Sequence, residues 1–202
     1  MSLWTAISRV DHQNSYWRVS QGFEFASREK TVEVFATELS SLLAHYVLGF
    51  ALIGNKFRLV ALLGLGGEKN CYVTADNKWM CPVVPAELRS FPFATINSDA
   101  GGKVFCIDRN YVTDQSDDTP FFDGVGGFAP ATAKIYEFLN VCETNRKVTQ
   151  ASCEALIEAK LIEPWPLRIR NSDGEDSLAI HGLHRINENR LKSISRSSLS
   201  KL

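Results

Sequence analysis

The feature of this sequence that most constrains its fold is an apolar stretch at residues 42–65 with polar side chains near its middle. Those polar residues are His45, Asn55, Lys56 and Arg58. A bilayer penalises polar groups most strongly at that depth, so the stretch is not expected to cross a membrane. We interpret it as the end of a buried helix followed by a core strand at residues 56–65, since a continuous apolar run bounded by glycines is typical of a buried strand.

Length and composition indicate an ordinary globular chain. The 202 residues suit one domain, and 45% hydrophobic with 22% charged residues is enough for a sizeable core. The net charge of −1 predicts neither a nucleic-acid partner nor attraction to an anionic membrane. The first residues lack a basic start followed by an apolar core, so we expect a soluble, cytoplasmic protein, with export by a non-classical route left open.

The remaining pattern predicts an α+β fold, an antiparallel sheet with flanking helices in a single domain spanning residues 1–202. Apolar residues at helical spacing predict a helix over residues 31–48, and either one long helix or two consecutive ones over 130–160. The predicted strands are one or two short ones in 15–26, one at 70–79 paired with 56–65, and one at 103–107. A hairpin of 167–170 with 178–186 is predicted around residues 172–174. A short helix is predicted after Pro85, and a last short helix before a frayed tail at about 196–202.

One long segment carries a family resemblance. Residues 57–93 read FRLVALLGLGGEKNCYVTADNKWMCPVVPAELRSFPF, and CID, GLHRIN and RLKSI follow later in the chain. This ordered pattern resembles the signature of the bacterial SapC family over roughly residues 12–195. The family is named after a gene associated with surface-layer production. The resemblance implies no catalytic residues.

Cysteine and histidine spacing does not favour a metal site. The five cysteines are scattered without a C-x-x-C pair, and we expect them to be reduced thiols in the core. His181 and His184 are three residues apart, and in one strand they would point to opposite faces. We therefore expect no metal and no cofactor.

The candidate ligand-binding residues are Trp79, Arg89, Phe91 and Phe93, together with Glu38. The first four combine aromatic walls with one cation, as ligand grooves do, although a core with one exposed arginine gives the same pattern. Glu38 lies near the apolar stripe of the predicted helix, where a carboxylate needs a partner, unless it sits at the edge of the stripe and is partly exposed.

Two further segments have alternative interpretations. Residues 124–133, GVGGFAPATA, place glycines before a helix but lack the Lys-Ser/Thr of a nucleotide loop, so a flexible entry to the helix is the preferred interpretation. His45 is predicted to be buried and hydrogen-bonded rather than a catalytic base.

Three functions stay open, in this order. The first is a non-enzymatic accessory or interaction protein of the envelope or surface layer, with a protein partner or a second copy of the chain. The second is a small-ligand sensor domain, with a cavity formed by residues 57–65 and 79–93. The third is an enzyme that uses Glu38, His45 or Arg89 in an unfamiliar site.

Overall fold

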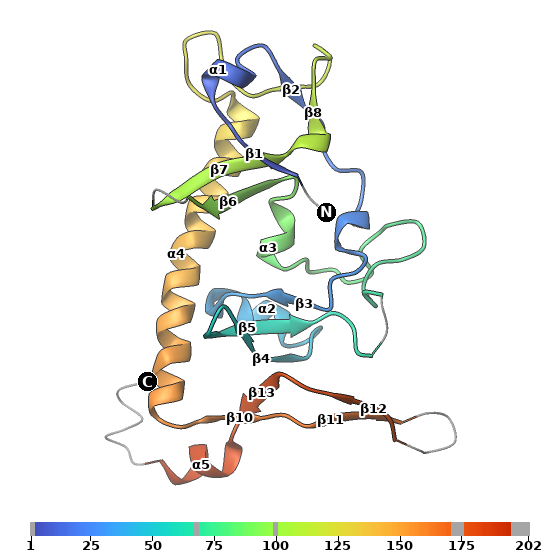
Figure 1. The fold of residues 1–202 in the computed structure, drawn as a ribbon, viewed down its shortest axis with the longest axis vertical. Helices are drawn as coiled ribbons and strands as arrows, with labels where there is room; N and C mark the ends of the chain where they lie inside the picture. The colour runs from blue at the N-terminus through green and yellow to red at the C-terminus, as the bar shows by residue number, and fades with distance from the viewer. Residues whose placement is uncertain (1–2, 67–68, 99–100, 171–175, 195–202) are drawn as a thin grey trace. The chain divides into compact units, whose positions relative to one another are not determined.

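The computed structural model describes residues 3–66, 69–98, 101–170 and 176–194 (Figure 1). It combines antiparallel sheets with one long helix and several short ones, so the predicted α+β class is confirmed. The chain divides into two compact units, the first formed by Met1–Gly22 with Leu88–Glu143 and the second by Phe23–Glu87 with Thr144–Leu202. The single domain stays a prediction. The expected turn at 172–174 and the tail at 196–202 lie outside the described residues.

The first unit contains two small antiparallel sheets, with strand orders β1-β7-β6 and β8-β2-β9. Its predicted strand at 103–107 is confirmed as β7, and the segment 15–26 forms a strand only at β2 within this unit. Its elements are β1 (Trp4–Ala6), α1 (Arg9–His12), β2 (Tyr16–Trp17), β6 (Phe93–Asn97), β7 (Lys103–Asp108), η3 (Arg109–Tyr111), β8 (Val112–Thr113), β9 (Thr119–Pro120) and the first half of α4 (Pro130–Glu158). The short helix α3 (Ala86–Arg89) confirms the helix predicted after Pro85 and spans the boundary between the units.

An aromatic core with internal hydrogen bonds stabilises the first unit. The rings of Trp17 and Phe93 meet edge to face, with centroids 4.8 Å apart. The buried indole nitrogen of Trp17 donates a hydrogen bond of 3.0 Å to the hydroxyl of Thr132, which is itself fully buried. That hydroxyl donates in turn to the carbonyl oxygen of Pro120 at 3.2 Å. Both of these buried donors therefore have an acceptor.

We expect Thr132→Val to destabilise the protein by about 1–3 kcal/mol, because valine matches the shape of threonine but leaves the buried indole N–H of Trp17 without an acceptor. Chemical denaturation monitored by tryptophan fluorescence measures the change in the free energy of unfolding. Thr37→Val, at an exposed threonine, is the control and should change stability by less than about 0.5 kcal/mol. Equal stability of the two variants would contradict the role given to this hydrogen bond.

The second unit is built on a five-stranded antiparallel sheet of order β10-β13-β4-β5-β3, with a separate hairpin of β11 and β12. Its elements are η1 (Glu24–Ala26), β3 (Thr31–Glu33), η2 (Ala36–Glu38), α2 (Leu39–Leu42), β4 (Leu48–Ile53), β5 (Lys56–Leu62), the second half of α4, β10 (Ile162–Pro164), β11 (Leu167–Arg170), β12 (Asp176–Ile180), β13 (Leu183–Ile186) and α5 (Glu188–Ser193). The predicted core strand is β5, and the predicted last short helix is α5.

The partner of β5 differs from the predicted one. β5 pairs with β4 through a two-residue turn at Gly54 and Asn55, whose φ angles are +56° and +62°. Two successive positive φ angles are those of a type I′ hairpin turn, which Gly and Asn adopt readily. The predicted pairing of residues 70–79 with β5 is wrong, since that segment forms only an isolated bridge between Val73 and Trp79. The tight turn expected at Asp76-Asn77 is present, with Asn77 at a φ of +61°.

The helix predicted over residues 31–48 is also wrong. Thr31, Val32 and Glu33 form β3, because β-branched residues favour a strand and β5 offers an unpaired edge. Only the short elements η2 and α2 are helical in the rest of the segment. The apolar residues of the predicted stripe are nonetheless buried in part: Phe35 and Leu42 are fully inaccessible to solvent.

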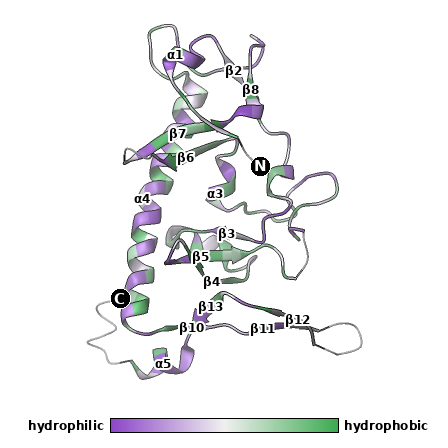
Figure 2. Cartoon of the chain, viewed as in Figure 1, coloured by the Kyte–Doolittle hydropathy of each residue, from purple (hydrophilic) through white to green (hydrophobic). Residues whose placement is uncertain are grey.

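The helix predicted over 130–160 forms as one continuous helix, α4, of 29 residues. Figure 2 shows hydrophilic and hydrophobic bands alternating along it, as expected for a helix with one buried face. The predicted hairpin of residues 167–170 is confirmed in the pairing of β11 with β12, but the chain turns again at Gly182, where φ is +85°, before β13 begins. Within the described ranges, no helix combines the length and apolar character needed to cross a bilayer.

Candidate functional site

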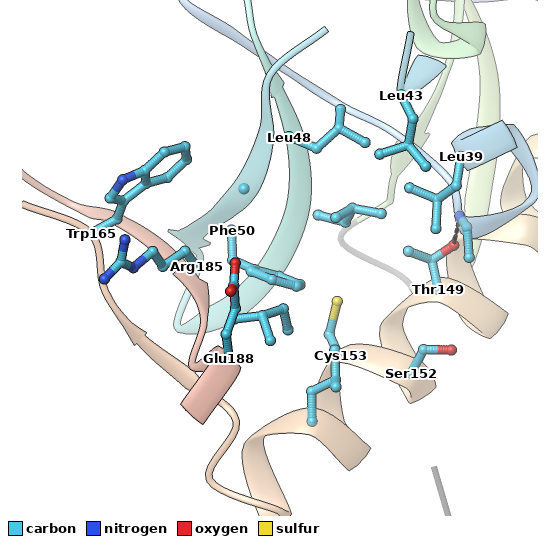
Figure 3. A pocket seen from close by; sticks show the side chains of 15 residues that line it. Leu39, Leu43, Leu48, Phe50, Thr149, Ser152, Cys153, Trp165, Arg185 and Glu188 are labelled. Atoms are coloured by element: carbon cyan, nitrogen blue, oxygen red, sulfur yellow. Dashed lines mark hydrogen bonds between the residues drawn. The ribbon is translucent and has the colours of Figure 1, made fainter. Parts of the chain in front are cut away.

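The second unit contains an apolar pocket of about 520 Å³ (Figure 3). Small-molecule sites have volumes of roughly 300–1,000 Å³, so this pocket can hold a ligand. Its lining residues are Ala36, Leu39, Leu43, Leu48, Gly49, Phe50, Leu59, Thr149, Ser152, Cys153, Leu156, Trp165, Arg185, Ile186 and Glu188.

The sheet and the segment before it provide two of the walls. Phe50 of β4 lies directly opposite Leu59 of β5 in the ladder, so the two side chains share one face of the sheet. Both are buried, with 6% and 9% of their surface exposed. Leu39 and Leu43, from α2 and its end, face these strands across the pocket in Figure 3.

The helix α4 provides the third wall through Thr149, Ser152, Cys153 and Leu156. This i, i+3, i+4, i+7 spacing places the four side chains on one face of the helix. The hydroxyl of Thr149 accepts from the backbone nitrogen of Ala36 at 2.8 Å and donates to the Asn145 carbonyl oxygen, also at 2.8 Å.

Ser152 likewise donates to the carbonyl oxygen of Val148, one turn earlier in the helix, at 3.1 Å. The protons of both hydroxyls on this wall are thus engaged by backbone carbonyls. Because they are not offered to the pocket, the α4 wall behaves as an apolar surface.

The pocket is bordered by the place where the sheet pairing ends. β13 pairs with β4 at Leu183–Ala51 and His184–Phe50, and the register does not extend to Gly49. A Cβ atom at Gly49 would lie 3.1 Å from the carbonyl oxygen of His184 and 3.2 Å from the ring of Trp165. Glycine at this position therefore allows the Trp165 ring to lie against β4 at the edge of the pocket.

Charged side chains line the pocket on the side of β13 and α5. The Nε of Arg185 donates to Glu163 at 3.0 Å, and the second oxygen of Glu163 accepts from the Asn187 side chain at 2.7 Å. Glu188 follows directly in the first turn of α5. Its carboxylate makes no hydrogen bond or ion pair with any residue in the described part of the chain.

The thiol of Cys153 is the buried titratable group of the pocket. It is 2% exposed, and desolvation by burial raises its pKa above the ordinary value for cysteine. The thiol is therefore protonated at neutral pH, which suits an apolar wall and makes a nucleophilic role unfavourable.

The candidate Trp79 belongs to a different cluster of the second unit. Its indole nitrogen donates to the hydroxyl of Tyr46 at 2.8 Å, and its ring stacks on Tyr72 with centroids 5.8 Å apart. The Tyr46 hydroxyl donates to the carbonyl oxygen of Val83. Desolvation raises the pKa of Tyr46 well above its ordinary value, with a smaller contribution from a hydrogen bond to Cys81. These contacts indicate a packed, hydrogen-bonded cluster.

The other aromatic candidates are residues of the first unit. Phe93 is buried in the aromatic core, and Phe91 packs on Tyr111 with ring centroids 5.0 Å apart. Arg89 is exposed, and its guanidinium lies 5.1 Å from the ring centroid of Phe138. Trp79 is thus assigned to one unit and these three residues to the other, and none of the four lines the apolar pocket.

Glu38 is half-buried at the end of η2, as expected for a residue at the edge of the apolar stripe. Its carboxylate accepts hydrogen bonds from the backbone nitrogens of Ala86 at 2.8 Å and Phe35 at 3.2 Å. It therefore holds the start of α3 against η2. Glu38 does not line the pocket, although Ala36 and Leu39, close to it in the sequence, do.

Two predictions about burial are wrong. His45 is exposed rather than buried, because the predicted helix ends at Leu42 and the chain then turns toward β4. Cys71 is exposed, since residues 70–79 do not join the sheet, whereas Cys106, Cys142 and Cys153 are buried as predicted.

A second, polar pocket of about 400 Å³ lies in the first unit beside the glycine-rich segment 124–133, lined by Arg9, Gln13, Asn14, Phe122, Asp123, Gly124, Val125 and Gly126. Asp123 accepts hydrogen bonds from the backbone nitrogens of Gly127 at 2.7 Å and Val125 at 3.0 Å. The bond from Gly127 is the main reason that the pKa of Asp123 lies below its ordinary value. The carboxylate thereby closes the loop before α4.

No group of three or more metal-ligating side chains comes together in the part of the chain that the structure describes. His181 precedes β13 rather than lying in a strand with His184. The ring of His184 instead packs edge to face on Phe57, with centroids 4.7 Å apart. The predicted opposite orientation of these two histidines within one strand therefore does not apply.

Fold and pocket together define an α+β protein with an apolar site between a sheet and a helix. A family model described as SapC matches residues 7–202, nearly the whole chain. The chain belongs to the SapC family. No curated protein and no solved structure matches it significantly.

Of the cavity predicted from residues 57–65 and 79–93, only Leu59 lines this pocket, and sequence reasoning missed its other residues, although a signal for one wall was present. Thr149, Ser152, Cys153 and Leu156 recur at helical spacing, and the first three are small. Small side chains on the buried face of a helix leave space against a sheet. Leu39 and Leu43 were not recognised as a wall of the pocket because residues 31–48 were predicted to form one helix.

We expect a maleimide reagent to modify Cys71 quickly and Cys153 much more slowly in the folded protein. Burial shields the Cys153 thiol and raises its pKa, so its thiolate forms only at a pH above that of a free cysteine, and its labelling rate should rise later with pH. Peptide mass spectrometry after timed labelling between about pH 7 and pH 9 measures both rates. Labelling of Cys153 at the rate of Cys71 at neutral pH would contradict the buried position given to this wall.

Proposed function

We propose that this SapC-family protein is a ligand-binding module that holds a small, largely apolar molecule in the pocket between α4 and the five-stranded sheet. The observation that carries the proposal is the pocket itself, about 520 Å³ with mainly aliphatic and aromatic walls. Apolar walls with a few polar groups at one side are typical of small-molecule sites. This corresponds to the second of the three functions that the sequence left open.

The energetics of filling the pocket support the proposal. Apolar surface that a ligand removes from water stabilises the complex by about 25 cal/mol per Å², or about 0.8 kcal/mol for each buried CH₂ group. Leu48, Phe50 and Leu59 present such surface from the sheet, and Leu39 presents it from α2. Because the hydroxyl protons of Thr149 and Ser152 are already engaged, an apolar ligand leaves no polar proton of that wall without an acceptor.

The proposal predicts a dependence of affinity on chain length for linear alcohols. Each CH₂ added between butanol and octanol should tighten binding by up to about fourfold, the factor that corresponds to about 0.8 kcal/mol. Isothermal titration calorimetry or chemical shifts of the pocket residues measure the dissociation constants. Affinities that do not change with chain length would exclude an apolar site here.

Filling the pocket with a side chain should abolish this binding. Ser152→Phe places an aromatic ring in the pocket from the α4 wall, and phenylalanine has a helix propensity close to that of serine. Ala151→Phe is the matched control, since it adds a larger side chain at the neighbouring exposed position of the same helix. We expect loss of octanol binding in the first variant and unchanged binding in the second, with circular dichroism to show that both fold. Octanol binding retained by a folded Ser152→Phe protein would place the ligand elsewhere.

A second candidate function is supported by exposed apolar side chains of the second unit. Leu43, Val47, Leu52 and Ile53 are each between 49% and 65% exposed. A contiguous apolar patch on a surface often marks a protein interface, and if these side chains form one they favour the accessory protein of the envelope or surface layer that the family's name suggests. Sedimentation of the wild type and of a Leu52→Lys, Ile53→Lys variant tests whether these side chains mediate association with a second copy or a protein partner.

A further inference from the structure

The charged side chains at one side of the apolar pocket would contact the head group of its ligand. Two charged side chains, Arg185 and Glu188, line the pocket, and both come from the segment that joins β13 to α5. The remaining lining consists of apolar side chains, a glycine, a buried thiol and two hydroxyls whose protons are engaged by the helix. A ligand that fills the pocket therefore meets its polar contacts at one end only.

The positive charge at this end is already balanced. The guanidinium of Arg185 pairs with Glu163 at 3.0 Å, and Asn187 holds the other oxygen of that carboxylate at 2.7 Å. Asn187 is in turn fixed as the N-cap of α5, since its side chain accepts a hydrogen bond from the backbone nitrogen of Arg190 at 2.8 Å. Arg185 and Glu163 are thus a preassembled neutral pair.

Glu188 is the other charged side chain of the lining. Within the described part of the chain its carboxylate has neither an ion pair nor a hydrogen bond. Figure 3 shows it extending from the start of α5 along the side of Phe50, whereas the guanidinium of Arg185 points toward Trp165. Among the charged lining residues and their described ion-pair partner, the charges of Arg185 and Glu163 cancel, and the negative charge of Glu188 remains beside an apolar wall.

We propose, on the basis of the proposed binding function, that the ligand is an amphiphile with a positively charged amine head, and that Glu188 accepts this amine while the hydrocarbon part fills the pocket. A protonated amine supplies donors for the carboxylate oxygens and neutralises the excess charge. A carboxylate head would meet Glu188 as a like charge, and the charge of Arg185 is already offset by Glu163.

Three probes that differ only in their head group test the inference: octylamine, which is protonated at neutral pH, octanol and octanoate. Because Glu188 is exposed, the gain from its charge is modest, and we expect octylamine to bind about three- to fivefold more tightly than octanol at about 0.15 M salt. Octanoate should bind more weakly than octanol. The measurement is isothermal titration calorimetry on the full chain.

The Glu188→Gln variant keeps the size of the side chain and removes its charge, so octylamine and octanol should then bind equally. Glu158→Gln is the matched control, because it removes an exposed carboxylate that does not line the pocket and should preserve the preference for the amine. The variants are both surface substitutions, and binding of octanol to each shows that the pocket is intact.

The outcomes separate this inference from the function on which it rests. If none of the three probes binds, the proposed pocket function fails. If they bind with equal affinity, if octanoate binds most tightly, or if Glu188→Gln retains the preference for octylamine, the apolar pocket stands and the amine head group is overturned. If Glu158→Gln removes the preference as well, it arises from overall charge and the role of Glu188 is again overturned.

Discussion

The hairpin of β4 and β5 is the interaction on which the second unit depends. Its ladder runs from Leu48–Ala61 to Ile53–Lys56, and β3 and β13 pair with its two outer edges. Val60 and Ala61, in the two pairs of this ladder that lie farthest from the turn, have no exposed surface. The side chains of Leu48, Phe50 and Leu59 reach the pocket from this hairpin, so a change of register by one residue would turn them to the opposite face and remove the pocket's floor.

An ion-pair network connects this sheet to the long helix within the same unit. Glu33 of β3 binds Arg58 of β5 at 3.2 Å and also Arg146 of α4, whose second terminal nitrogen lies 2.7 Å from Glu87. The guanidinium of Arg146 further lies 5.2 Å from the ring centroid of Phe35. Side chains of Glu33 and Arg146 are less than one-fifth exposed, so the network lies in a region where charges need partners. It holds α4 near the sheet while the smaller residues of its next turns leave the pocket open.

The pocket favours apolar ligands because most polar groups of its lining already have partners within the protein. Thr149 and Ser152 direct their protons to carbonyls of α4, Cys153 keeps its proton because burial raises its pKa, and Arg185 is paired with Glu163. An unsatisfied buried polar group costs about 1–3 kcal/mol, so such pairing is the condition under which a pocket with several polar residues still favours apolar ligands. This leaves Glu188 as the one charge in the lining without a partner among the described residues.

The sequence by itself determined the α+β class, the strand β5, the helix α4 and membership of the SapC family, since these follow from local periodicity, composition and an ordered motif. It did not determine which strand pairs with β5 or the secondary structure of residues 31–48. An isolated apolar segment satisfies both the helical spacing and the strand pattern, and only pairing along the free edge of β5 decides between them. For the same reason it did not locate the apolar pocket: Trp79, Arg89, Phe91 and Phe93 are close in the chain but are divided between two units, whereas Leu39, Phe50, Cys153 and Glu188, distant in the chain, line one pocket. Which side chains meet is a property of long-range packing, because the free energy of burial depends on contacts that no local pattern specifies.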